Sequence, residues 1–284
     1  MSWFRKIALC ALAAAALCSC SKKVTVIAVH EVFFTASVKT YSTKASDSAF
    51  ENGDKVRILA GSPIGETAVG TIRGNLIDPD VPMYWIKNQK ESTTFAAIYQ
   101  ADKVAGANSS LSYDLLSGGR HDYNVHNRLL VALSTVKPLE TVGFEFNHPF
   151  SKILINITNK LSGSDIQMVE VKGVVMKGKV NLEEQTLDLT GPKETVEAYK
   201  LADRKYAAVV MPQTAAPVIM VTANGDRYRF ELDAPFTFEP GFAYSADITL
   251  EPGIDPEMPV AATFSFTVTS WEDGAALDYE PVTD

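Results

Sequence analysis

Hydrophobic and polar residues alternate with a period of two through most of the chain after residue 30. The clearest run is 262–268, in which Ala, Phe, Phe and Val alternate with Thr and Ser. Residues 32–38, 153–157, 228–232 and 242–250 follow the same pattern. This alternation is typical of strands that bury one face and expose the other.

Shorter apolar runs predict further strands at 55–59, 93–99, 129–133 and 141–146. The dipeptide Asn224-Gly225 lies between the runs 217–222 and 227–232, which predicts a hairpin with a type I′ turn. Many short strands separated by turn signals are typical of β-sandwiches and not of parallel α/β units. The predicted fold class is therefore all-β.

Two stretches resist assignment to strands. Residues 62–90 contain Pro63, Pro79 and Pro82 with scattered glycine, which predicts loop. Residues 101–128 are polar and contain glycine, with a short helical turn predicted at 113–116. The small polar break at 162–164 marks the predicted boundary between domains at 20–163 and 164–284, after a signal segment at 1–19.

The N-terminal segment has the pattern of a secretory signal. Arg5 and Lys6 precede a short apolar run at 7–17, which is too short to span a bilayer. The sequence Leu17-Cys18-Ser19-Cys20 resembles the processing box of bacterial lipoproteins, in which the final cysteine is acylated and becomes the first residue. We therefore predict lipidation at Cys20 and attachment to a membrane through the lipid.

Composition narrows the function classes. All three cysteines lie in the first twenty positions, so a chain processed at Cys20 has no free thiol for a disulfide, a metal or a nucleophile. The formal charge is −8, and the chain has no cluster of Lys or Arg, which argues against nucleic-acid binding.

No pattern of catalytic residues emerges. His121 and His126 are read as solvated loop residues, because their spacing does not place two ligands on one helix face. His148 is read as a turn residue that bonds the local backbone. The carboxylate pairs at 183–184 and 272–273 lie in predicted turns, where such pairs are usually solvated. We expect no catalytic site, metal site or cofactor, and hence no enzyme.

Four segments together resemble the fimbrillin family, the lipoprotein-derived subunits of type V pili. They are 33–56, with Ser42-Thr43-Lys44-Ala45 inside it; 142–153, with Phe146-Asn147-His148-Pro149-Phe150-Ser151-Lys152-Ile153; 209–214, with Pro212-Gln213; and 270–274, with Trp271. They follow the family's order across nearly the whole chain after the signal segment.

The resemblance implies two transthyretin-like antiparallel β-sandwich domains in tandem. It also implies a location on the outer membrane and cell surface, other fimbrial subunits as partners, and a host or bacterial surface ligand. A protease removes the first strand in this family, and a strand of another subunit replaces it. Here the removed strand is 24–38, the donor strand is expected around 261–271, and the processing position is Lys44 where the family typically has arginine.

Other hypotheses stay open. The chain is a stalk, tip or anchor subunit, and an uncleaved chain would keep its lipid. The tripeptide Asp47-Ser48-Ala49 resembles an acceptor for O-glycosylation at Ser48. The alternative function is a surface lipoprotein that binds glycan, with Tyr84, Trp85 and Tyr99 as a stacking platform.

Overall fold

The computed structural model describes residues 30–38, 50–99, 105–107, 110–116, 121–161, 165–181, 184, 186–232, 234–255 and 258–271. The chain divides into two compact units, Met1–His30 and Glu31–Asp284, and every described sheet belongs to the second. None of the described helices has the length and apolarity that a membrane span requires.

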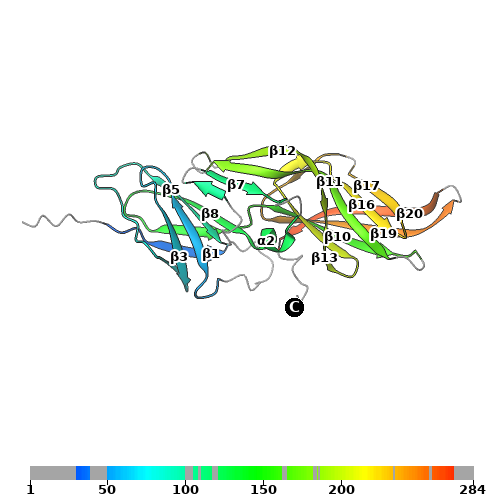
Figure 1. Ribbon diagram of the computed structural model, residues 1–284, viewed down its shortest axis with the longest axis horizontal. Helices are drawn as coiled ribbons and strands as arrows, with labels where there is room; N and C mark the ends of the chain where they lie inside the picture. The colour runs from blue at the N-terminus through cyan, green and yellow to red at the C-terminus, as the bar shows by residue number, and fades with distance from the viewer. Residues whose placement is uncertain are drawn as a thin grey trace, which may run out of the picture. The chain divides into compact units, whose positions relative to one another are not determined.

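The described residues are nearly all in strands, which confirms the all-β prediction (Figure 1). The helix is α2 (Tyr123–Arg128). The strands are β1 (Phe34–Val38), β2 (Lys55–Ala60), β3 (Thr67–Arg73), β4 (Leu76–Pro79), β5 (Thr93–Tyr99), β6 (Ala105–Ala107), β7 (Ser110–Asp114), β8 (Leu130–Val136), β9 (Val142–Phe146), β10 (Ser151–Asn159), β11 (Ile166–Asn181), β12 (Thr186–Glu197), β13 (Tyr199–Ala202), β14 (Lys205–Val210), β15 (Gln213–Ala215), β16 (Val218–Ala223), β17 (Asp226–Glu231), β18 (Phe236–Phe238), β19 (Phe242–Asp255) and β20 (Met258–Ser270).

The first sheet has the order β8-β5-β2-β3-β4-β1-β9 and curls until its two edge strands meet. Just past the end of β9, Asn147 exchanges two backbone hydrogen bonds with Val131 of β8, at 2.9 and 3.0 Å. The enclosed core contains Phe34, Phe95 and Phe144. The sheet therefore closes on itself around its own hydrophobic core.

The second core lies among a five-stranded sheet (β13-β14-β10-β19-β20), a six-stranded sheet (β17-β16-β11-β7-β6, with β12 on β11) and the pair β15-β18. Leu59, Ala96 and Ile98 of the first sheet join this core through the face that points away from their own core. Strands β2 and β5 are thus buried on both faces, as strands shared by two packed layers must be.

Several predicted elements are confirmed. The run 93–99 is β5, and 55–59, 129–133 and 141–146 correspond to β2, β8 and β9 within a few residues. Strands β16 and β17 pair across Asn224-Gly225, and both turn residues have positive φ (54° and 85°), as a type I′ turn requires.

The prediction of loop at 62–90 is wrong over β3 and β4. These strands form a hairpin around Gly74, which has φ +63°. The inward positions of β3 include Gly70, where a Cβ atom would lie 2.2 Å from Ile77 Cγ2. Because close packing demands glycine here, the strand lacks the apolar residue that would have completed its alternation.

The prediction for 101–128 is also wrong in detail. The turn expected at 113–116 begins inside β7, whose Leu111 and Tyr113 are buried. The helix lies later, at α2, where the side chain of Asp122 accepts a hydrogen bond from the Val125 N–H at its N-terminus.

Two predicted faces differ from the pattern. Lys152 and Leu154 of β10 are buried like their neighbours Ile153 and Ile155, because β10 is central in its sheet. Val268 of β20 is exposed, although Phe266 on the same face packs into the core.

The predicted domain boundary at 163–164 falls between β10 and β11, and residues 162–164 lie outside the described residues. Strand β10 pairs with β14 and β19, and β7 pairs with β11. The division into 20–163 and 164–284 stays a prediction.

Candidate functional site

The first strand, β1, lies inside the closed sheet between two partners (Figure 1). It runs parallel to β9 over five residue pairs, from Phe34 opposite Val142 to Val38 opposite Phe146. On its other side it runs antiparallel to β4, with Phe34 opposite Ile77. Removing β1 would leave two strand edges without partners.

Backbone hydrogen bonds extend this pairing beyond the strand. The Val32 N–H donates to the Met83 carbonyl at 2.9 Å, and the Ala36 N–H donates to the Asn75 carbonyl at 2.9 Å. On the opposite side, the Val142 N–H donates to the Phe33 carbonyl at 2.8 Å. The segment is therefore held along its length by main-chain bonds, which do not depend on side-chain identity.

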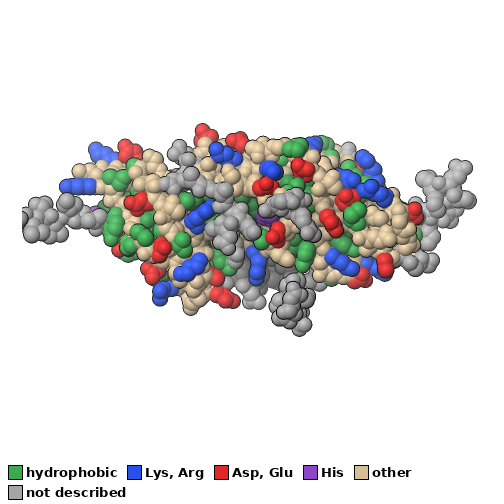
Figure 2. Space-filling model, in the orientation of Figure 1, with side chains coloured by type: hydrophobic (Ala, Val, Ile, Leu, Met, Phe, Trp, Pro, Cys, Tyr) green, Lys and Arg blue, Asp and Glu red, His purple; other side chains and the backbone are tan. Residues whose placement is uncertain are grey.

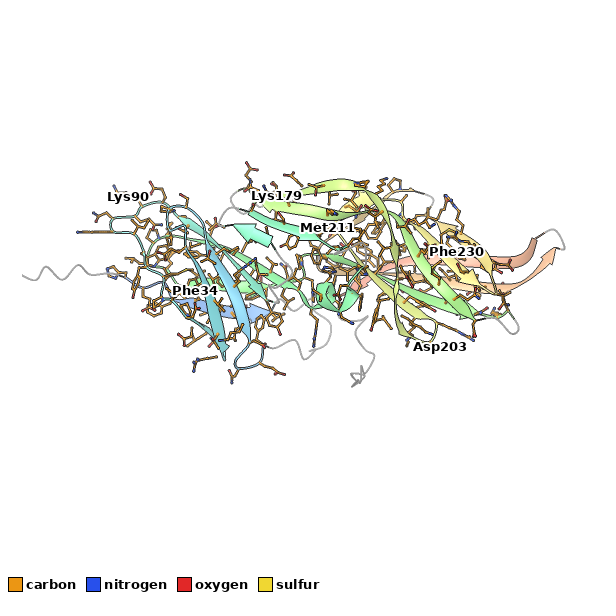
Figure 3. The ribbon with its side chains drawn as sticks, in the orientation of Figure 1. Phe34, Lys90, Lys179, Asp203, Met211 and Phe230 are labelled. Carbon is orange, nitrogen blue, oxygen red and sulfur yellow. The ribbon has the colours of Figure 1, made fainter. Side chains whose placement is uncertain are left out.

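The inward side chains of this segment anchor it in the first core. Phe34 stacks on Phe144 at 5.9 Å between ring centroids and meets Phe95 edge-on at 5.7 Å (Figure 3). Val32 and Ala36 are buried as predicted, whereas Val38 is half-buried at the end of the strand. Fully burying a Val or Phe side chain contributes about 1.5–3 kcal/mol. These contacts fix one register, because a shift by one residue would turn Phe34 outward.

A second cluster joins residues from motifs far apart in the sequence. The Trp271 indole is buried and stacks on the His148 imidazole, with ring centroids 4.1 Å apart. The Lys152 Nζ atom lies 4.6 Å from the centroid of the same indole. Trp271 directly follows β20, so this cluster fixes the end of β20 against the turn between β9 and β10.

The reading of His148 as a residue that bonds only its local turn is wrong. Besides the stacking on Trp271, the polar backbone group that acts on it belongs to Leu129, far away in sequence. Burial, and then the neighbouring Lys152, lower the pKa of His148 to about 3. The imidazole is therefore neutral at neutral pH, which suits a ring stacked in an apolar setting.

The Gln213 side chain explains the Pro212-Gln213 segment. Its amide nitrogen donates to the Val175 carbonyl at 3.0 Å and to the Met211 carbonyl at 2.9 Å. Its amide oxygen accepts from the Val175 N–H at 2.9 Å. Gln213 thus satisfies buried main-chain groups, which is a structural role.

His121 and His126 are not solvated. His126 is buried in α2, and the His121 ring packs against it at 5.8 Å between centroids. Burial, and then His126, lower the pKa of His121 to about 4. Among the described residues, no group of three or more His, Cys, Asp or Glu side chains could hold a metal ion.

The predicted aromatic platform does not form. Trp85 is buried and meets Phe95 edge-on, and Tyr99 is half-buried against Phe50. Of the three residues, Tyr84 alone is exposed. Lys, Arg, Asp and Glu side chains are mixed over the face in Figure 2, which shows no large area of one sign.

The other predicted site residues, Cys20, Lys44 and Ser48, lie outside the described residues, as does 24–29 of the predicted removable strand. Sequence reasoning missed the β3–β4 hairpin that supplies one partner of β1. The apolar pair Leu76-Ile77 beside Gly74 was the available signal.

Comparisons with known proteins agree with this architecture. A family model described as fimbrillin-like matches residues 43–271. A search of curated proteins finds no significant match.

Solved structures share the fold at low sequence identity. The fimbrial anchor protein Mfa2 of Porphyromonas gingivalis is 10% identical, with a TM-score of 0.51, over 86% of this chain and 98% of Mfa2. The tip fimbrial protein Mfa3 of the same organism is 10% identical, with a TM-score of 0.52, over 85% of this chain and 100% of that structure. A protein of Bacteroides uniformis assigned to cell adhesion is 17% identical, with a TM-score of 0.60, over 85% of this chain and 99% of its own.

Proposed function

Because the chain belongs to the fimbrillin-like family, we propose that it is exported as a lipoprotein and built into a surface fimbria by protease-triggered strand exchange. The family and the fold support a role as a fimbrial subunit or anchor at the cell surface. Acylation of Cys20, attachment to the outer membrane and processing at Lys44 are the finer parts of the proposal.

The placement of β1 carries the proposal. The strand is the first of the unit Glu31–Asp284 and lies between two partners that come later in the chain. A cut anywhere in 39–49 would therefore leave β1 attached by non-covalent contacts alone. Loss of β1 would expose the facing edges of β4 and β9, and unpaired edges favour addition of a new strand.

Energetics support replacement over simple loss. Val32 and Phe34 together contribute several kcal/mol through burial. That amount is comparable with the whole stability of many domains, about 5–15 kcal/mol. A chain that has lost β1 should be unstable until a donor strand restores the apolar contacts and the main-chain bonds.

The donor expected at 261–271 would carry a cost. Strand β20 pairs with β19 from Ser270 to Met258, and Phe266 stacks on Tyr244 at 5.9 Å. Donation of β20 would therefore remove these contacts from the second core of its own subunit. Any donation from this region has to compensate for that loss in the acceptor.

Limited trypsin digestion tests the exchange. The purified chain, a Lys44→Gln variant and a Lys39→Gln variant are digested, and the N-terminal sequence, the melting temperature and the size in solution are measured. We expect cleavage after Lys44, a lower melting temperature and formation of oligomers, all absent in Lys44→Gln. A cleaved chain that sheds 20–44 yet stays monomeric with an unchanged melting temperature would contradict strand exchange.

Lipidation has an independent test. Metabolic labelling with a fatty acid should mark the wild-type chain and not Cys20→Ala, while Cys18→Ala serves as the matched control. Equal labelling of Cys20→Ala would remove the lipoprotein assignment without touching the proposal for β1.

We also propose that Ser48 carries a glycan, in the same segment as Lys44. Intact mass of the exported chain should show an added hexose series that Ser48→Ala lacks. A wild-type mass equal to that of the unmodified polypeptide would reject it.

A further inference from the structure

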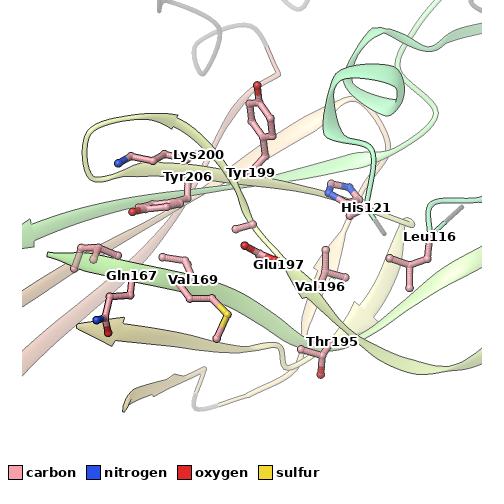
Figure 4. Close-up of a pocket in the computed structure, with 13 residues that line it drawn as sticks. Leu116, His121, Gln167, Val169, Thr195, Val196, Glu197, Tyr199, Lys200 and Tyr206 are labelled. Carbon is pink, nitrogen blue, oxygen red and sulfur yellow. The ribbon is translucent and has the colours of Figure 1, made fainter. Parts of the chain in front are cut away.

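A cavity of about 490 Å³ lies where the chain passes from one sheet of the second core to the other (Figure 4). Strand β12 pairs with β11 in the six-stranded sheet, and β13 pairs with β14 in the five-stranded sheet. Between them, the Ala198 N–H donates to the Val169 carbonyl at 2.8 Å. The crossing chain thus forms one wall of a hollow between two diverging sheets.

The lining combines an apolar floor with a polar rim. Val169, Val196 and Ala198 are buried lining residues. Glu197 and Lys200 are exposed lining residues on the crossing segment. Further polar lining comes from Gln167 and Thr195.

Two tyrosines complete the lining. The Tyr199 ring stacks on Tyr123, with centroids 5.0 Å apart and planes 7° apart, which holds its orientation. Tyr206 is buried in the wall. Tyrosine offers an apolar face and a hydroxyl group, the combination that suits a ligand with both kinds of surface.

The charges of the lining cancel. Glu197 and Lys200 carry opposite charges, and His121, also in the wall, is neutral at neutral pH because its pKa is lowered. A phosphate-bearing ligand would meet a single lysine beside a carboxylate, which disfavours it. A wholly apolar ligand would leave the polar rim without partners, which is also unfavourable.

We propose that this pocket binds one uncharged sugar residue at the end of a glycan. Its volume falls within the range of about 300–1,000 Å³ that is usual for small-molecule sites. Sugar hydroxyls can bond the carboxylate of Glu197, the amide of Gln167 and the hydroxyl of Thr195, while the C–H face of the ring packs on tyrosine. The site shares no residue with the pairing of β1, so it stands apart from strand exchange.

Saturation-transfer NMR on the purified chain tests the proposal, with galactose, mannose and N-acetylglucosamine as probes. At least one sugar should show transfer and titrate with a dissociation constant of about 1 mM, equivalent to about 4 kcal/mol. Glu197→Gln keeps the shape of the side chain and should weaken binding about tenfold. Glu194→Gln, on the same strand but outside the lining, should bind like the wild type.

Tyr199→Ala adds a second variant for the aromatic contact, with an equal loss expected. A circular-dichroism melt of each variant separates lost binding from lost folding, and Glu197→Gln, at an exposed position, should melt like the wild type. Absence of transfer from all three sugars would overturn the proposal. Binding that Glu197→Gln and Tyr199→Ala leave unchanged would overturn it too, because the sugar would then bind elsewhere.

Discussion

The first and last described strands of the unit Glu31–Asp284 are held in opposite ways. Strand β1 is short, lies inside its sheet and pairs on both sides. Strand β20 is long, lies at the edge of its sheet and pairs with β19 alone. β20 also continues from β19 through a short connection, and Trp271 fixes its far end.

This difference teaches which strand can be exchanged. Loss of β1 opens a gap between two partners that only another strand can fill. Loss of β20 exposes one new edge on β19 but breaks a hairpin and an aromatic cluster. Covalent attachment therefore protects β20, whereas a single cut would leave β1 held by packing and main-chain bonds.

The largest expected effect comes from the anchor of β1. Phe34→Ala should destabilise the chain by about 3–5 kcal/mol, the usual cost of truncating a buried aromatic side chain. The matched control is Phe33→Ala, since Phe33 is 64% exposed and should change stability little. Urea denaturation measures both. Equal effects of the two variants would show that packing does not hold β1.

Gln213 offers the corresponding test in the second core. Gln213→Leu removes the partner of Val175 and Met211 backbone groups, each of which costs about 1–3 kcal/mol when left buried and unpaired. Chemical denaturation should show a loss in this range. The exposed neighbour Thr214→Ala is the control and should cost far less. A neutral Gln213→Leu would mean that water replaces the amide.

Acid should weaken the end of β20 through His148. Its pKa is about 3 in the folded chain against 6.5 for an ordinary histidine, so the unfolded chain binds the proton more readily between these values. Stability should therefore fall as the pH drops from 6.5 toward 3, by up to about 1.4 kcal/mol per pH unit for this group.

The control variant His148→Phe keeps an aromatic ring beside Trp271 and removes the titration. Its stability should depend less steeply on pH by about one proton over the same interval. Thermal melts at a series of pH values measure both slopes. Identical slopes would show that His148 does not titrate with folding.

The smallest effect is expected from surface charge beside β1. The ion pair between Arg73 and Asp78 joins β3 to β4 at 3.4 Å, and both side chains are largely exposed. Arg73→Gln should cost less than about 1 kcal/mol, since exposed ion pairs are weak and screened by salt. Denaturation curves at low and high salt measure the effect. A larger, salt-sensitive loss would mean that charge helps hold this side of the gap.

The sequence allowed prediction of the strands wherever burial followed alternation. It failed at Gly70, because the space beside Ile77 admits no side chain and the apolar signal disappears. It failed at β10, since a central strand buries both faces and Lys152 is accommodated beside Trp271. These outcomes depend on contacts between distant segments, which local patterns do not contain.

The candidate site was predicted unevenly for the same reason. Burial of Val32, Phe34 and Ala36 could be read from their spacing. The partners of β1, and the meeting of His148 with Trp271, depend on topology. The pocket beside β13 gave no sequence signal, because its lining comes from four strands and the segment before α2.

The bridge between Val131 and Asn147 has a consequence for stoichiometry. Because it closes the first sheet into a ring, removal of β1 would create one gap of fixed width and not two independent edges. A ring with one place vacant has a valence of one. Each subunit could then accept a single neighbour at this position, so assembly through this gap would give an unbranched filament, its length set by supply of subunits and not by competition between edges.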